Sequence, residues 1–263
     1  MLYLYHNDMS VCAQKVRMVL AHKELDWEGS NLNLRAAEQF SPDFLRISPK
    51  GLVPVLVHDD EVILESNAIV QYLDEVFPDS PLLSLDAVER AQTRGWLIRL
   101  DAGLHEQLAV ISFCVAFRHQ LLQRHTTSES LQGFFSQISD PSRRAVMEDI
   151  VTNGLESPRL RLAALAYKKL ISDMAAALAD SEWLVGGKIS LADFAMLPYI
   201  ERLEQLQLSG WWEAYPQLNQ WLAQLRASQA YTVGVRDWSN PSYIQLMNES
   251  GSVAWPHMKA LPG

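Results

Sequence analysis

The first 80 residues combine short apolar runs with two longer amphipathic segments. Strands are predicted at residues 2–5, around residues 30–34, and in a hairpin between Val53 and Leu64 that turns at its polar middle. Helices are predicted at residues 10–22 and 66–77, where apolar side chains recur at helical spacing. Ser10 stands where an N-cap would, and Pro78 ends the second helix. This order indicates a small α/β domain over residues 1–80.

Beyond Pro78 the pattern changes, and helical spacing dominates. The candidate helices are residues 86–122 (bent or broken within that length), 142–180, 190–208 and 215–227. Residues 125–140, rich in Ser, Thr and Gln, are expected to form a loop, and the Pro- and Gly-containing tail from 238 to 263 is expected to be irregular. The sequence therefore predicts an all-helical domain over residues 86–263 that ends in an irregular tail.

Composition and charge exclude several classes of function. The 263 residues are 48% hydrophobic, and 22 basic against 31 acidic residues give a net charge of −9. Residues 1–80 hold 6 basic and 13 acidic residues, hence −7, and such a surface repels nucleic acid. No apolar run approaches the ~20 residues of a membrane span, and no signal peptide is recognised. With two cysteines the chain is expected to be cytoplasmic, without a disulfide framework.

Candidate chemistry lies at the starts of the two N-terminal helices. Ser10 and Cys12 share the first turn of one helix, where the positive end of the helix dipole lowers the pKa of a thiol; alternatively, Ser10 is a cap and Cys12 a core residue. Glu65 and Ser66 open the other helix, a place that favours an anion, although Ser66 could be a simple N-cap. Pro54, at a strand start, could be cis or trans.

Other motifs indicate structure rather than chemistry. Residues 190–193 (Ser-Leu-Ala-Asp) form a capping-box pattern, in which the Asp193 carboxylate accepts from the Ser190 N–H and the Ser190 hydroxyl accepts from the Asp193 N–H. The seven histidines lack metal-ligand spacing, so no metal site is expected. There is no phosphate-binding glycine loop and no hydrolase elbow.

Taken in order, several short motifs form a recognisable series. They are Ser10-Val-Cys12-Ala-Gln-Lys-Val-Arg17, Gln39-Phe-Ser, Pro49-Lys-Gly-Leu-Val-Pro54-Val-Leu, Glu65-Ser-Asn-Ala-Ile-Val-Gln-Tyr-Leu73 and Gly187-Lys-Ile-Ser-Leu-Ala-Asp193. This series resembles the cytosolic glutathione transferase superfamily over residues 1–80 and 183–226, and the likeness is poor over 118–165. The resemblance implies a thioredoxin-like N-terminal domain, an all-helical C-terminal domain and a homodimer.

The resemblance also implies a site. Glutathione would be the co-substrate; the Val53 backbone, held by a cis Pro54, would meet its cysteinyl part. Glu65 and Ser66 would take its γ-glutamyl end, and Gln39 would be a further contact. Ser10-x-Cys12 resembles the Ser-x-Cys of zeta-class enzymes and hydroquinone dehalogenases, in which the serine hydrogen-bonds the glutathione thiolate. The longer middle segment resembles bacterial β-etherases.

The function expected from this resemblance is transfer of glutathione to a hydrophobic, aromatic electrophile in a detoxification reaction. The helical domain would hold that electrophile, with Trp96, Phe113, Phe117, Phe134 and Trp183 as candidate wall residues. One alternative is a glutathione-dependent thiol–disulfide reductase or reductive dehalogenase that uses Cys12. A second is a non-enzymatic binding module that keeps the fold.

Overall fold

The computed structural model describes residues 1–262, which fold as two compact units. The first unit comprises Met1–Asp101, Met174–Ile200 and Tyr215–Asn240; the second comprises Ala102–Asp173, Glu201–Ala214 and Pro241 onward. Each unit combines segments that are separate in the sequence. The domain division at residues 1–80 and 86–263 therefore stays a prediction.

The sheet of the first unit has four strands in the order β2-β1-β3-β4. Its strands are β1 (Leu2–His6), β2 (Glu28–Asn31), β3 (Val55–His58) and β4 (Glu61–Ile63). β2 is parallel to β1, whereas β3 is antiparallel to both β1 and β4. The predicted hairpin is confirmed, and the strand expected around 30–34 lies slightly earlier.

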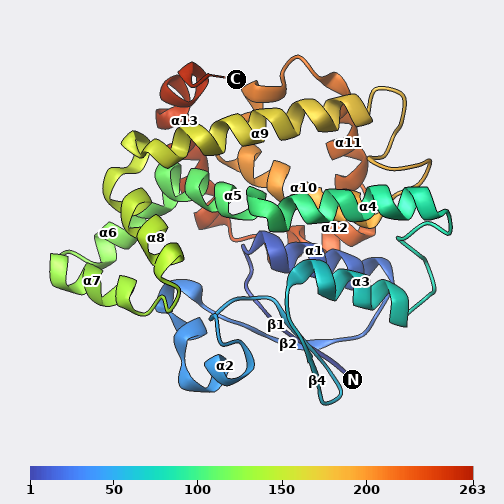
Figure 1. Ribbon diagram of the computed structural model, residues 1–263, viewed down its shortest axis with the longest axis horizontal. Helices are drawn as coiled ribbons and strands as arrows, with labels where there is room; N and C mark the ends of the chain where they lie inside the picture. The colour runs from blue at the N-terminus through green and yellow to red at the C-terminus, as the bar shows by residue number, and fades with distance from the viewer. Residues whose placement is uncertain (263) are drawn as a thin grey trace. The chain divides into compact units, whose positions relative to one another are not determined.

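Helices cover both faces of this sheet. α1 (Val11–His22) and α3 (Ser66–Val76) lie side by side (Figure 1), as their spacing of apolar residues predicts. Along β1 the buried side chains alternate, and Leu4 is fully buried. The Tyr5 ring, on the other face, lies 5.6 Å from the ring of Phe44 in α2 (Pro42–Ile47). Two short 3₁₀ turns, η1 (Leu34–Ala36) and η2 (Glu38–Phe40), precede α2.

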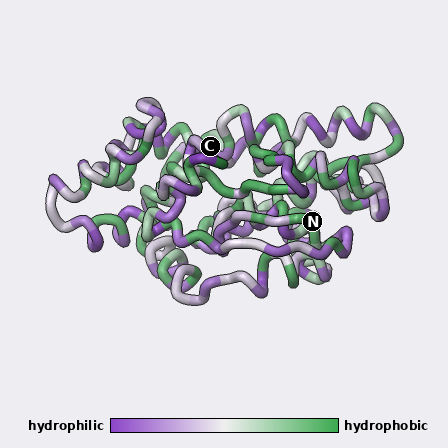
Figure 2. The backbone as a smooth tube through the Cα atoms, turned by 90° about the horizontal axis from the view of Figure 1, so that it is seen from below, coloured by the Kyte–Doolittle hydropathy of each residue, from purple (hydrophilic) through white to green (hydrophobic). Residues whose placement is uncertain are grey.

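The first long helical run, Ala87–Arg124, is broken within its length, as predicted. It comprises α4 (Ala87–Arg99), η3 (Leu100–Leu104), α5 (His105–Ser112), η4 (Phe113–Phe117) and α6 (Arg118–Arg124), with π-type turns at η3 and η4. The break lies at Gly103, because its φ of 128° is not helical. Along the helices, hydrophobic positions recur at short intervals with hydrophilic ones between them (Figure 2).

The same run, Ala87–Arg124, is long and apolar enough to cross a membrane by length and composition. Half of its most apolar window is buried within the structure, as in the core helix of a folded domain. The expectation of no membrane-spanning segment therefore stays a prediction.

Two expectations for the later helices are wrong. The remaining elements are α7 (Ser128–Ser136), α8 (Pro141–Asn153), η5 (Gly154–Glu156), α9 (Pro158–Ala177), α10 (Leu191–Gln205), η6 (Ser209–Trp212), α11 (Pro216–Arg226), α12 (Gln229–Gly234), η7 (Arg236–Trp238) and α13 (Pro241–Ala260). The expected loop at 125–140 contains α7, which Thr127 caps at its start. The expected helix at 142–180 is divided at Gly154, whose φ is 55°.

The predicted irregular tail is also wrong, because most of it is α13. Met247, Gly251, Ala254 and Met258 are buried at helical spacing along one face of this helix. Gly251 serves close packing, since a Cβ there would meet the Leu206 carbonyl oxygen at 2.1 Å. The glycine that argued against a helix in the sequence is what allows this helix to pack. Residue 263 lies outside the described residues.

The capping pattern of residues 190–193 anchors the core of the first unit. The fully buried Asp193 carboxylate accepts from the N–H groups of Ser190 and Leu184, both at 2.9 Å, and from the indole of Trp221 at 2.8 Å. The Ser190 hydroxyl also donates to it, and accepts from the N–H of Ala192 rather than from that of Asp193. Burial raises the pKa of Asp193, against these hydrogen bonds.

Candidate functional site

The sheet topology gathers several loops at one edge. β1 ends at His6 where the antiparallel β3 begins, since Tyr5 pairs with Val55. β4 ends at the same edge, and so does β2, which is parallel to β1. The segments 7–10, 32–40, 53–54 and 64–66 therefore meet at this edge, and they contain the predicted site residues Ser10, Gln39, Val53, Pro54, Glu65 and Ser66.

Ser10 caps α1 at this edge. Its φ and ψ of −70° and 117° are those of an N-cap, and its Oγ accepts from the N–H of Ala13 at 3.3 Å. The half-buried Cys12 lies in the first turn, with its Sγ 3.6 Å from the hydroxyl of Tyr199 in α10. The hydroxyl and the thiol thus share one helix N-terminus, where an anion is stabilised.

α3 also begins at this edge, without a side-chain cap. Glu65 precedes it with a φ of 64°, and among the described residues no side chain caps the free N–H groups of its first turn. These N–H groups are open to an anion. The Glu65 carboxylate lies 3.2 Å from the ammonium of Lys50 in an exposed ion pair.

Three further predicted residues lie in the segments of this edge. The Val53–Pro54 peptide bond is cis, which decides between the alternatives that the sequence left open. Gln39, in η2, is nearly buried, and its Oε1 has no hydrogen-bond partner among the described residues. A buried amide oxygen without a donor is costly, so a ligand that donates a hydrogen bond fits here.

Sequence reasoning missed the buried Arg17 beneath this edge. The buried Arg17 guanidinium donates to the carbonyls of Asn7 and Asp8, both at 2.9 Å, and so fixes the loop that leads to Ser10. It also lies 3.1 Å from Nδ1 of His6. Burial, together with the charge of Arg17, lowers the pKa of His6 to about 3, so its imidazole is neutral. The amphipathic pattern of residues 10–22 predicts that Arg17 is exposed, and it gives no signal that this side chain is buried.

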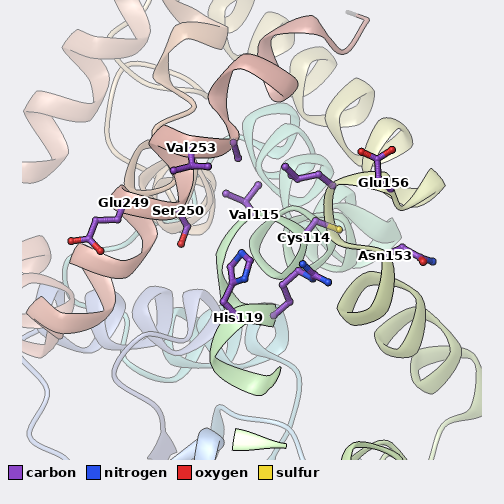
Figure 3. Close-up of a pocket in the computed structure, with 11 residues that line it drawn as sticks. Cys114, Val115, His119, Asn153, Glu156, Glu249, Ser250 and Val253 are labelled. Atoms are coloured by element: carbon purple, nitrogen blue, oxygen red, sulfur yellow. The ribbon is translucent and has the colours of Figure 1, made fainter. Parts of the chain in front are cut away.

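A separate cavity of about 540 Å³ lies within the second unit (Figure 3). Its floor is apolar, with Cys114, Val115 and Ala254 buried, and its lining is completed by Arg118, His119, Asn153, Leu155, Glu156, Glu249, Ser250 and Val253. Burial raises the pKa of the Cys114 thiol to about 12, so it is no nucleophile at neutral pH. The aromatic residues expected as walls do not line this cavity; Phe113 and Phe117, for example, pack edge-to-face on each other.

Comparison with known proteins decides the family. Two family models match the chain: the glutathione S-transferase N-terminal domain over residues 9–76 and the glutathione S-transferase C-terminal domain over residues 158–224. The chain belongs to the glutathione S-transferase family. The predicted fold, a small α/β domain with a helical C-terminal part, is confirmed by this match and by solved transferase structures.

Several relatives of different activity are similar to the chain. Glutathione S-transferase Z1 of Arabidopsis thaliana is 44% identical over 114 residues, 43% of this chain and 52% of the relative. The tetrachloro-p-hydroquinone reductive dehalogenase of Sphingobium chlorophenolicum is 24% identical over 87% of this chain and 93% of its own length. The crystal structure of the β-etherase LigF from Sphingobium superposes with a TM-score of 0.80 and 25% identity, over 89% of this chain and 98% of that one.

The matches to the first curated relatives are partial. The chain spans about half of the Arabidopsis transferase, 52%, and 40% of glutathione S-transferase 1 of Dianthus caryophyllus. Membership of the family therefore rests on the two family models, and the substrates are a separate question.

Proposed function

We propose that this transferase binds glutathione at the sheet edge and transfers it to a hydrophobic, aromatic electrophile. The observation that carries the proposal is that α1 and α3 both open at this edge, with Ser10 and Ser66 at their starts. Glutathione carries two groups that suit such positions, a thiolate and a γ-glutamyl carboxylate. The family match supports this use of the edge.

Each predicted site residue has a role in this proposal. The N–H groups at Ser66 bind the γ-glutamyl carboxylate, and Glu65 accepts from the α-ammonium of glutathione, in exchange for its exposed pair with Lys50. The Val53 backbone binds the cysteinyl part, and Gln39 accepts a hydrogen bond at its unpartnered oxygen. Metal plays no part in this scheme.

Ser10 would supply the chemistry. Its hydroxyl donates a hydrogen bond to the glutathione sulfur, and together with the N-terminus of α1 it favours the thiolate over the thiol. The thiolate then attacks the electrophilic carbon, forming a carbon–sulfur bond, while the leaving group departs with its electron pair. The protein contributes by raising the thiolate fraction and by orienting the two reactants.

Glutathione binding and consumption test this function. We expect calorimetry to show binding to the purified protein, and glutathione to be consumed with at least one member of a panel of aryl halides, β-aryl ethers, quinones and epoxides. Binding without consumption across the panel would favour the non-enzymatic module. Absence of binding would contradict the proposal altogether.

The cavity of the second unit is a separate candidate site for a small hydrophobic molecule. Its volume of about 540 Å³ is typical of small-molecule sites, and its floor is apolar. All of its lining residues fall outside the matched ranges 9–76 and 158–224, so neither family model covers this cavity.

A separate observation at Cys12 supports the redox alternative. Cys12 lies on the same helical turn as Ser10 and is within 3.6 Å of the Tyr199 hydroxyl, a donor that could stabilise a thiolate. A thiolate at Cys12 could attack a glutathione disulfide, forming a mixed disulfide and releasing one glutathione thiolate. The similarity to a reductive dehalogenase supports keeping this alternative.

The assembly and location are further parts of the proposal. We expect a cytoplasmic homodimer that acts in detoxification, because the family resemblance implies a dimer and because neither of the two cysteines forms a disulfide within residues 1–262. Sedimentation should give twice the chain mass of 29.7 kDa. A mass equal to one chain would contradict the dimer.

A further inference from the structure

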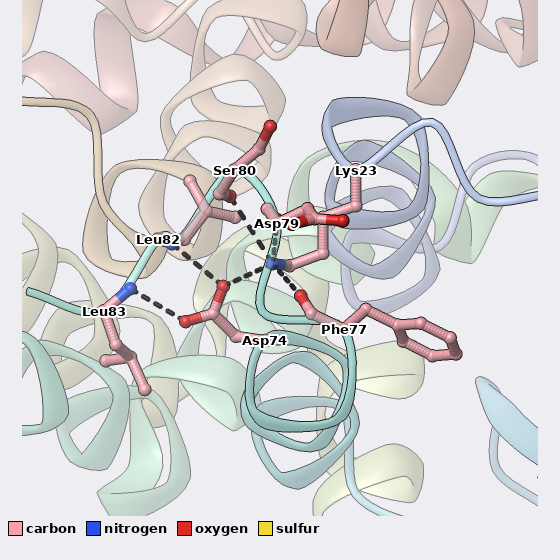
Figure 4. A network of polar contacts seen from close by, with 7 residues as sticks. All are labelled: Lys23, Asp74, Phe77, Asp79, Ser80, Leu82 and Leu83. Carbon is pink, nitrogen blue, oxygen red and sulfur yellow. Dashed lines mark hydrogen bonds and ion pairs between the residues drawn. The ribbon is translucent and has the colours of Figure 1, made fainter.

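Two lysines near α1 are buried, and they differ in how their charge is compensated. Lys23, at the end of α1, is 8% exposed, and its Nζ lies 2.7 Å from the Asp74 carboxylate. The same ammonium donates to the carbonyls of Phe77 at 2.8 Å and Asp79 at 3.0 Å (Figure 4). The charge of Lys23 is therefore paired within the protein.

Lys15, in the middle of α1, has no such counter-charge. It is 1% exposed, its Nζ donates to Oδ1 of Asn67 at 2.5 Å, and it lies 5.7 Å from the centre of the Tyr199 ring. Within residues 1–262 no carboxylate approaches this ammonium to ion-pair distance. Burying an ammonium without a carboxylate partner is energetically costly, which is unusual for a purely structural residue.

The groups around Lys15 act on the pKa of its ammonium in opposite directions. Burial lowers the pKa of Lys15, whereas Cys12, Asp101 and Glu65 act in the opposite direction through their negative charges. Asn67 is held in place because its amide donates to the Asp101 carboxylate at 2.8 Å and to the Leu97 carbonyl at 2.9 Å. Its Oδ1 is thereby turned to the ammonium.

The ammonium lies beneath both helix starts of the site. Lys15 is one turn after Cys12 on α1, and helical side chains lean toward the N-terminus of their helix. Its partner Asn67 is the second residue of α3, next to Ser66. Both anionic groups of glutathione in the proposed function would therefore bind close to this one cation.

We propose that Lys15 is a positioning residue whose buried ammonium provides the positive charge that retains the glutathione anion and stabilises its thiolate. The inference rests on the proposed function. It accounts for how an anion could bind to a segment, residues 1–80, that carries 6 basic and 13 acidic residues. Because an anion nearby favours the ammonium form of Lys15, binding of glutathione and protonation of Lys15 support each other.

Paired lysine variants test this inference. Lys15→Met keeps the length of the side chain and removes its charge, and we expect the affinity for glutathione to fall about 10-fold or more. The pKa of the bound thiol, followed by the ultraviolet absorbance of the thiolate as pH is raised, should increase by about one unit. Lys23→Met is the matched control, with expected loss of thermal stability and unchanged affinity and thiol pKa.

Two further variants separate charge from packing. Lys15→Gln keeps a donor for Asn67 without the charge, and should lose affinity as Lys15→Met does, whereas Lys15→Arg should retain most of it. The inference about Lys15 would be overturned if folded Lys15→Gln or Lys15→Met protein binds glutathione within about twofold of wild type, with an unchanged thiol pKa. The proposed function would stand in that case. Wild-type protein that binds no glutathione would overturn the proposed function, and the inference with it.

Discussion

Ser10→Ala is expected to lower kcat/KM for glutathione conjugation about 100- to 1,000-fold, the usual loss when a single donor to a developing or bound anion is removed. The hydroxyl at the N-cap of α1 can donate to the sulfur, and alanine cannot. The pKa of bound glutathione should rise toward that of free glutathione, and a pH profile of kcat/KM would measure the change. Part of the effect comes from losing the cap, which costs about 1 kcal/mol of stability.

Cys12→Ser is the companion variant. In the proposed transferase it should keep most of the conjugating activity, because Ser10 is intact. In the redox alternative it should abolish exchange with a glutathione disulfide, since that reaction requires the Cys12 sulfur. If the Ser10→Ala protein conjugates normally and the Cys12→Ser protein is inactive, Cys12 and not Ser10 carries the chemistry.

Asp74→Ala is expected to cost the fold about 3 to 5 kcal/mol of unfolding free energy, because it leaves the Lys23 ammonium buried without its counter-ion. Asp74 also accepts from the N–H groups of Leu82, at 2.8 Å, and Leu83, at 2.9 Å, so it holds the segment that follows α3 (Figure 4). Denaturant unfolding would measure the loss.

Glu75→Ala is the matched control for this variant. Glu75 is the next residue on α3, and its exposed carboxylate lies 3.6 Å from Arg94. Surface pairs of this kind contribute at most about 1 kcal/mol. Equal losses from Glu75→Ala and Asp74→Ala would show that burial of the Lys23–Asp74 pair has no special role.

Local signals in the sequence were sufficient for the part of the fold that forms the site edge. Ser10 as a cap, alternating valines after Pro54 and the amphipathic segment from Ser66 are patterns within a few residues, and α1, β3 and α3 follow them. The convergence of these segments depends on strand order, which in the sequence came from the family resemblance.

Long-range packing explains what the sequence did not predict. α13 forms because Gly251 allows its backbone to approach Leu206, a contact that no local pattern encodes. Lys15 and Arg17 have the spacing of exposed residues on an amphipathic helix, yet both are 1% exposed because α1 is covered on several sides. The burial of these two charged side chains therefore could not be predicted without knowing which elements pack against α1.

The close approach of α12 to α1 has a consequence for synthesis of the protein. The Arg17 guanidinium, which orders the loop before Ser10, donates to the Gly234 carbonyl at 2.8 Å, a partner 217 residues away in the sequence. Gly234 has no room for a side chain, since a Cβ would meet the Met18 nitrogen at 2.6 Å. On the ribosome, the loop before Ser10 cannot acquire this contact until nearly the whole chain has emerged, so prematurely terminated products would leave the loop unfinished.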